Sequence, residues 1–222
     1  MNPDPAHLAR DPTLTPTRGP HPPVCHHPRV IPPDLAARLA PHDAPLADPA
    51  PMRHAAVLAA LLPGDDPRIV LIERAGHLRS HAGQLAFPGG KPEPADRDLL
   101  DTALREAEEE VALPRGQVRI LGRLRPVPVP TGHLIVAFVG IVEGDWQPRW
   151  DTSEVSAVLT PSLRELADPA HYRFLGTREW LGVHYAMHEY QIHTPPLWGA
   201  TARMVHELLH HLDLGPAPQD LA

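Results

Sequence analysis

The sequence predicts one α+β domain, a sandwich with a mixed sheet, preceded by a proline-rich N-terminal arm. Its 222 residues are enough for one ordinary globular core with extensions. Four short apolar runs, rich in aliphatic residues, have the length of strands and lie at 54–62, 68–74, 118–124 and 133–142. Helical patterns separate these runs irregularly, which favours hairpin-like strand pairs over a regular alternation of strands and helices.

Proline is concentrated in the first 51 residues, in pieces such as "HPPVCHHPRVIPPD". Because proline lacks an N–H donor and fixes φ, we expect residues 1–51 to form an arm or wrapping segment. One short helix is expected there, opened by Pro33 and Asp34 and burying Leu35, Ala36 and Leu39. The domain itself is expected at 52–214, followed by a flexible tail at 215–222.

Charge and cysteine content exclude several classes of protein. The formal net charge of -7 argues against a protein that coats nucleic acid, although a small phosphorylated ligand needs only a local basic patch. Cys25 is the single cysteine, so no intramolecular disulfide forms, and its neighbours His26 and His27 have no spacing typical of a metal site. The N-terminus lacks the apolar run of a signal peptide or membrane span. We expect a soluble, cytoplasmic protein with no nucleic-acid or membrane partner, whose arm is compatible with packing on a second subunit of a homodimer.

Three more helices are expected in the domain. The segment "LLDTALREAEEEVAL" at 99–113 is amphipathic, and "TPSLRELA" at 160–167 is shorter. The segment "PPLWGATARMVHELLHHL" at 195–212 predicts a long C-terminal helix with a proline in its first turn.

The helix at 99–113 separates an apolar face from an acidic one, because each residue advances about 100° around the axis. The apolar residues at i, i+3, i+4 and i+7 spacing face the core: Leu100, Ala103, Leu104, Ala107 and Val111. Glu106, Glu109 and Glu110 share another side, whereas Glu108 points away from them toward solvent. Arg105 precedes Glu109 by four residues, so its guanidinium can hold that carboxylate.

Three carboxylates on one strip repel each other, and a hard divalent cation would relieve that repulsion. Mg²⁺ takes oxygen ligands and bridges protein carboxylates and substrate phosphates. The alternative is a solvated acidic face. The adjacent "FPGG" at 87–90 favours the metal, because glycine has no Cβ to keep backbone from a phosphate or cation. Phe87 in this stretch is expected in the core.

This segment resembles the signature of the Nudix hydrolases. Gly90 begins it, five residues separate it from the acid Asp96, and Arg105 and Glu106 are followed by the pair Glu109 and Glu110. Three features depart from the family pattern: an aspartate replaces the first glutamate, the spacer before the arginine is one residue longer, and Ala112 stands at a usual glycine. The resemblance implies a Nudix-type α/β/α sandwich and a metal-dependent hydrolase.

The preceding segment, "RAGHLRSHAGQLAFPGG", resembles the coenzyme A pyrophosphatase branch of that family, and so does "WGATARMVHELL" near the C-terminus. This likeness, over roughly residues 52 to 212, implies hydrolysis of coenzyme A to adenosine 3',5'-bisphosphate and 4'-phosphopantetheine with Mg²⁺ or Mn²⁺. It implies Arg74, Arg79 and Gly83 as substrate-binding residues.

The same resemblance implies Glu106, Glu110, Glu109 and the Gly89 carbonyl as metal ligands. We choose Glu109 as the catalytic base because Arg105 orients it beside these ligands, although a loop carboxylate can serve in this family. Two alternatives for the function stay open: a Nudix hydrolase of another nucleoside diphosphate derivative such as ADP-ribose, and a catalytically silent nucleotide-binding domain. Glu154, at the start of a predicted strand, is a second candidate base; the alternative is an ordinary residue at the edge of that strand.

Overall fold

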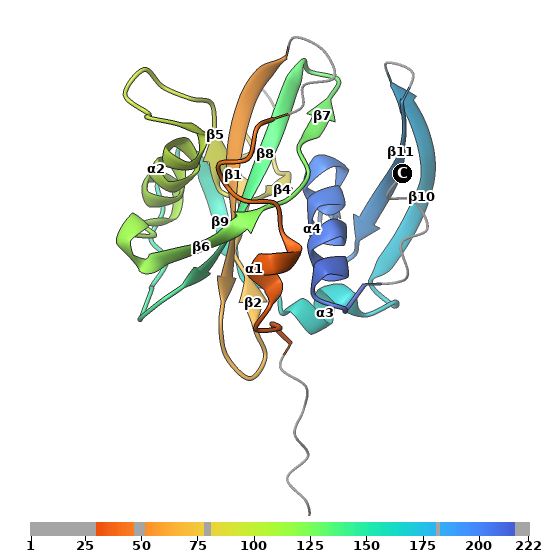
Figure 1. Cartoon of the computed structure of the whole chain (residues 1–222). Helices are drawn as coiled ribbons and strands as arrows, with labels where there is room; N and C mark the ends of the chain where they lie inside the picture. Colours follow the sequence, from red (N-terminus) through yellow and green to blue (C-terminus); the bar gives the residue numbers. More distant parts are fainter. Residues whose placement is uncertain (1–29, 47–51, 78–80, 181–182, 216–222) are drawn as a thin grey trace, which may run out of the picture.

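The computed structural model describes residues 30–46, 52–77, 81–180 and 183–215 (Figure 1). Its helices are α1 (Leu35–Arg38), α2 (Leu99–Val111), α3 (Leu163–Ala167) and α4 (Gly199–His211), with a 3-10 turn at Arg115–Gln117. Its strands are β1 (Arg53–Leu62), β2 (Arg68–Ile69), β3 (Leu71–Arg74), β4 (Leu85–Ala86), β5 (Gly89–Gly90), β6 (Val118–Arg123), β7 (Val127–Val129), β8 (His133–Val142), β9 (Val155–Leu159), β10 (Tyr172–Trp180), β11 (Val183–Tyr190) and β12 (Leu197–Trp198).

A six-stranded mixed sheet forms the centre of the molecule, in the order β2-β1-β8-β6, with β5 paired to β1 and β7 paired to β8. Strands β1 and β8 run parallel, with Arg53 opposite His133 and Leu61 opposite Ile141. They are also the two longest apolar runs, as expected for strands that are covered on both faces. Two smaller antiparallel sheets have the orders β4-β3-β9 and β10-β11-β12.

The two faces of β1 build two different cores, because successive side chains of a strand point to opposite sides. Ala56, Leu58 and Ala60 pack in one cluster with the apolar face of α2. Ala59 and Leu61 pack in the other cluster with apolar residues of α1 and α4. Figure 1 shows α2 and α4 on opposite sides of this sheet. The predicted α+β sandwich with a mixed sheet is therefore confirmed.

The expected core face of α2 is also confirmed. Ala103, Ala107 and Val111 are at most 1% exposed, and Leu100 and Leu104 are half-buried against the same cluster. Phe87 is buried in the opposite cluster, as expected. Within the described part of the chain, no helix has the length and apolar character needed to cross a bilayer.

Three details differ from the sequence prediction. The run 68–74 forms two strands, since β2 pairs with β1 while β3 pairs with β4 and β9. The C-terminal helix begins at Gly199, not at a proline, because Leu197 and Trp198 first pair with β11. The β10–β11 hairpin was not indicated by any apolar run, since charged residues and histidines interrupt its sequence.

The described part of the N-terminal arm, residues 30–46, packs on the domain beside β6 and α4. Leu35 and Leu39 of this segment are buried as expected, but Ala36 is exposed, because the single helical turn presents only one side to the core. Ala40 forms an isolated bridge with Arg123 of β6. Cys25, with its two neighbouring histidines, lies outside the described residues, as does the tail from residue 216.

Candidate active site

Helix α2 fixes the orientation of the acidic residues, and both of its ends are capped. At its start, Asp98 accepts a hydrogen bond from the Asp101 amide at 2.7 Å. At its end, Ala112 takes the left-handed conformation with φ 53°, and its amide donates to the Ala107 carbonyl. Glycine is the usual residue at such a helix terminus, so Ala112 departs from the family pattern at a position with a left-handed backbone.

The structure places three glutamates of α2 along one strip, which we call the carboxylate strip: Glu106, Glu109 and Glu110. Their side chains are 16%, 59% and 4% exposed respectively. Glu108 turns away from the strip and pairs with Arg115 at 3.2 Å, as the helical geometry predicts for the odd member of the run. The strip is thus graded from a buried end at Glu110 to an accessible end at Glu109.

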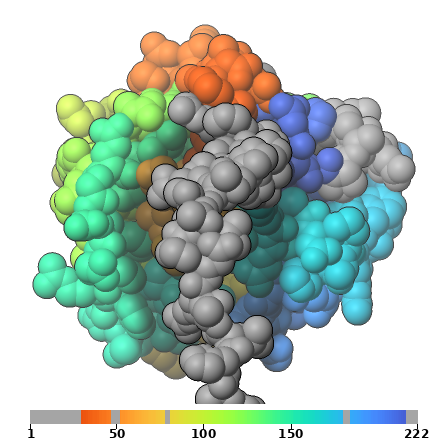
Figure 2. All heavy atoms as spheres, turned by 90° about the horizontal axis from the view of Figure 1, so that it is seen from below, coloured from red at the N-terminus to blue at the C-terminus, as the bar shows by residue number. Residues whose placement is uncertain are grey.

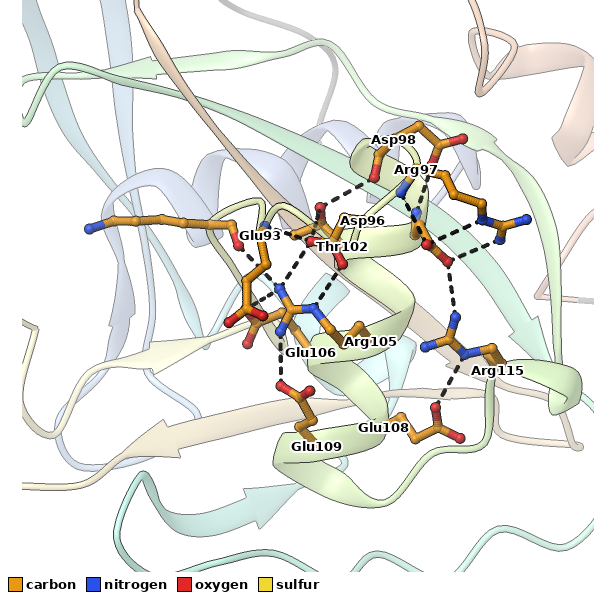
Figure 3. A network of polar contacts seen from close by, with 12 residues as sticks. Glu93, Asp96, Arg97, Asp98, Thr102, Arg105, Glu106, Glu108, Glu109 and Arg115 are labelled. Carbon is orange, nitrogen blue, oxygen red and sulfur yellow. Dashed lines mark hydrogen bonds and ion pairs between the residues drawn. The ribbon is translucent and has the colours of Figure 1, made fainter.

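Arg105 is the hub of the polar network around the strip (Figure 3). Its Nη1 donates to Glu109 at 2.9 Å, which confirms the pairing expected from the four-residue spacing. The guanidinium also donates to Asp96 from Nε at 2.9 Å and from Nη2 at 3.1 Å, and to Glu106 at 3.0 Å. Sequence reasoning missed Asp96 as the main partner, although its place in the family signature was the available signal.

Arg74, at the end of β3, approaches the buried end of the strip, and Gly83 lies in the turn that leads to β4. Arg74 Nη1 lies 3.8 Å from Glu110 Oε1, so this arginine contacts a carboxylate of the strip. The Gly83 amide donates to the Arg74 carbonyl at 2.9 Å, which closes the loop of the hairpin. Arg79, the third expected substrate-binding residue, lies outside the described residues.

The two glycines of β5 allow close approaches that no other residue permits. A Cβ on Gly90 would lie 2.2 Å from Glu106 Oε1, and a Cβ on Gly89 would lie 2.4 Å from the Ala56 carbonyl oxygen. The Gly89 amide donates to Glu110 Oε2 at 2.9 Å. Gly90 therefore lets the Glu106 carboxylate lie against the backbone of β5, whereas Gly89 lets β5 lie close to β1 and binds Glu110 through its amide.

Two carboxylates of the strip, Glu110 and Glu106, have raised pKa values, and burial is the main cause. Burial raises the pKa of Glu110 to about 7; the negative charges of Glu106 and Glu154 raise it further, while the Gly89 amide and Arg74 oppose the shift. Burial also raises the pKa of Glu106, against the effect of Arg105. The negative charge of Glu154, the residue directly before β9, contributes to the raised pKa of both groups.

These residues fit a hard divalent cation in their donor chemistry. The side-chain donors are carboxylate oxygens, and two of the carboxyl groups have pKa values raised by burial and by neighbouring negative charge. Among the described residues, however, no group of three or more His, Cys, Asp or Glu side chains is gathered closely enough to hold a metal. The arrangement suits a cation that completes its shell with water and substrate oxygens, not an all-protein cage.

Comparison with known proteins identifies the same family that the signature residues resemble. A family model of the NUDIX domain matches residues 52–180. The Nudix hydrolase NudL of Photorhabdus laumondii is 35% identical over 162 residues, which cover 73% of this chain and 86% of the relative. NudL of Yersinia pestis is 38% identical over 165 residues, 73% of this chain and 81% of the relative.

Solved structures show more distant likenesses. A MutT/nudix family protein from Enterococcus faecalis has a TM-score of 0.46 at 18% identity, over 76% of this chain and 63% of that chain. The NUDIX domain of Shewanella oneidensis NrtR, solved with ADP ribose, has a TM-score of 0.41 at 20% identity, over 53% and 79%. The family model spans more than half of the chain, and both NudL relatives are matched over most of their length, so the chain belongs to the Nudix family of hydrolases.

Proposed function

We propose that this chain hydrolyses the pyrophosphate bond of coenzyme A, with Mg²⁺ or Mn²⁺ held at the carboxylate strip. The observation that carries the proposal is the contact of Glu106 and Glu110 with the glycine pair of β5, which brings two carboxylates and bare backbone together. The likeness of residues 74–90 to coenzyme A pyrophosphatases supports this choice of substrate within the family.

Each residue of the strip has a distinct part in the proposed reaction. Glu106 and Glu110, with the Gly89 carbonyl, are the proposed metal ligands, and Glu109 adds a third carboxylate at the accessible end. The bound cation would neutralise charge on the phosphates and position the attacking water. Arg74, at the buried end of the strip, is placed to exchange its contact with Glu110 for a phosphate oxygen once a cation compensates that carboxylate.

Glu109 is our choice of general base. It is the most exposed of the three carboxylates, and Arg105 fixes its orientation from Nη1. It would take one proton from the attacking water, whose oxygen forms the new bond to phosphorus while the bridging P–O bond breaks. The products would be adenosine 3',5'-bisphosphate and 4'-phosphopantetheine. Glu154, whose negative charge acts on the same strip, is the alternative base.

The first test is a substrate panel with matched glutamine variants. Coenzyme A, dephospho-coenzyme A, ADP-ribose and nucleoside triphosphates are each incubated with Mg²⁺ or Mn²⁺, and the products are separated by chromatography. We expect coenzyme A to give the highest kcat/KM, since Arg74 and Arg79 would pair with its phosphates. A preference for ADP-ribose would agree with the hydrolase assignment but refute coenzyme A as the substrate.

The variants separate the strip from the rest of the acidic helix. Glu106→Gln and Glu110→Gln keep the shape of the side chain but remove the charge that would hold the cation, so both should lose most activity and weaken Mn²⁺ binding. Glu108→Gln is the matched control on the same helix and should remain nearly fully active, because Glu108 points to Arg115. A Glu110→Gln enzyme with the wild-type rate at limiting metal would refute the ligand assignment.

A further inference from the structure

A basic hollow of about 330 Å³ lies on the α4 side of the central sheet, whereas the carboxylate strip lies on the α2 side. Its charged lining comes from α1, the end of β6 and the residues after it, and the last turns of α4: Arg38, Arg123, Arg125, Glu207, His210 and His211. In Figure 1, α1 lies between β6 and the lower end of α4, and in Figure 2 the orange α1 segment lies beside the blue end of α4. The volume is that of a small-ligand site.

Arg123 is the residue in this hollow that needs an explanation. It is only 6% exposed, and its Nη2 donates to the carbonyls of Ala44 and Pro45, both at 3.1 Å. Its Nε is buried without any hydrogen-bond partner, and no carboxylate pairs with the guanidinium anywhere in the described part of the chain. A guanidinium keeps its charge in proteins, so it cannot escape this burial by losing a proton.

The other charges that line the hollow already have partners. Arg38 pairs with Asp34 and Asp213 and also donates to the carbonyl of His211, which caps the end of α4. Glu207 accepts from the amide of Arg125 at 2.9 Å and lies near its Nε.

Glu207 is the one carboxylate in the lining named above, and its charge is compensated. His211 lies 3.7 Å from it. Burial acts to raise the pKa of Glu207, but the nearby His211 and the hydrogen bond from the Arg125 amide lower it overall. Because neither Arg38 nor Glu207 is left over, the buried charge of Arg123 has no counter-ion from the lining of the hollow.

We propose that the hollow binds a phosphate-type oxyanion as the counter-ion of Arg123. Arg38 is neutralised by Asp34 and Asp213, and Arg125 by Glu207, so the uncompensated positive charge in the lining is that of Arg123. A planar guanidinium with several N–H donors favours the multiple acceptor oxygens of phosphate. The source is either free inorganic phosphate or the phosphate of a nucleotide, since both present the same group. This site is independent of the carboxylate strip and of the proposed hydrolysis.

The test titrates the full-length protein with inorganic phosphate by calorimetry, in EDTA and low salt, so that no metal can recruit phosphate to the strip. The wild type should bind one phosphate per chain, with a dissociation constant on the order of 1 mM. His210→Glu places a carboxylate in the lining without removing any donor of Arg123, and Arg123→Gln removes the buried charge. Each should weaken binding by about tenfold or more.

Two control variants locate the site. Arg119→Gln removes an exposed arginine of the same strand, one that pairs with Glu143 and does not line the hollow, so its phosphate affinity should equal that of the wild type. Glu110→Gln alters the carboxylate strip and should also leave the affinity unchanged. If Arg123→Gln does not fold, the outcome rests on His210→Glu, which changes a partly exposed side chain.

A parallel titration with adenosine monophosphate identifies the source of the oxyanion. Affinity equal to that of inorganic phosphate means that the free ion is the ligand, and tighter binding that His210→Glu abolishes means a nucleotide phosphate. If the wild type shows no saturable binding up to roughly 50 mM phosphate, the proposal is overturned. So would phosphate binding that His210→Glu leaves at wild-type strength.

Discussion

Replacing Asp96 by asparagine should destabilise the protein and slow its turnover together. The Asp96 side chain is 4% exposed and accepts two hydrogen bonds from Arg105, one from Thr102 and one from the Glu93 amide. A hydrogen bond to a charged group contributes about 1.5–3 kcal/mol and a neutral one about 0.5–1.5 kcal/mol. Asparagine offers one acceptor oxygen in place of two, so one of the two bonds from Arg105 is lost. This loss should cost about 1.5–3 kcal/mol, which corresponds to a fall in Tm of roughly 3–12 °C.

The ion pair of Asp96 with Arg105 also predicts how this stabilisation depends on pH. The hydrogen bonds from Arg105 hold the pKa of Asp96 well below its usual value. The contribution is therefore complete above the unfolded-state pKa of about 3.9 and is lost as the pH falls below that value toward the folded-state pKa. Thermal unfolding of Asp96→Asn at pH 7 should consequently show its full deficit against the wild type.

Turnover is measured on the same samples with coenzyme A. Freed from Asp96, Arg105 should orient Glu109 less well, so kcat should fall while KM changes little. Arg97→Gln is the matched control: Arg97 is 81% exposed in its pair with Asp101, so its Tm should stay within roughly 2 °C of the wild type. An Asp96→Asn protein with unchanged Tm and kcat would refute the reasoning, and a lowered Tm with unchanged kcat would limit Asp96 to the fold.

Three further predictions follow from single positions. Ala112→Gly should raise the free energy of unfolding by about 1 kcal/mol, because it relieves the left-handed conformation at the end of α2; a lower Tm would contradict this. Gly90→Ala should leave the circular dichroism spectrum intact but reduce kcat by about tenfold or more, because its Cβ displaces the Glu106 carboxylate. Burial, with the nearby charges of His206 and Arg203, lowers the pKa of His188 to about 4, so its contribution is complete above pH 6.5 and is lost as the pH falls toward 4. His188→Phe should flatten that part of the curve of Tm against pH, which otherwise falls over this range.

The sequence was sufficient for the fold wherever local pattern determines the element. Long apolar runs identified β1 and β8, and helical periodicity identified α2, because each is set by burial of its own side chains. The β10–β11 hairpin was missed because its core contacts come from elsewhere in the chain: His188 stacks on His206 of α4 with ring centres 3.9 Å apart. The start of α4 was misplaced for a similar reason, since pairing with β11 overrides the helix-opening preference of proline.

The site was predictable where its residues share one helix. Spacing alone gave the strip and the pairing of Arg105 with Glu109, because a helix fixes which side chains are neighbours. It could not give the contact of Arg74 with Glu110, which depends on how β3 lies against α2. The dominance of Asp96 over Glu109 as partner of Arg105 likewise depends on the path of the loop before the helix.

The hydrogen bond from Gly89 to Glu110 gives the protein a built-in spectroscopic reporter. This amide proton points at Oε2 of the most buried glutamate of the strip, at a donor–acceptor distance of 2.9 Å. Any change in the charge of that oxygen, whether by protonation or by a cation, alters the shielding of the proton. In a ¹⁵N–¹H correlation spectrum, the Gly89 cross-peak should therefore shift as Mg²⁺ is added, and would measure site occupancy without any substrate or turnover.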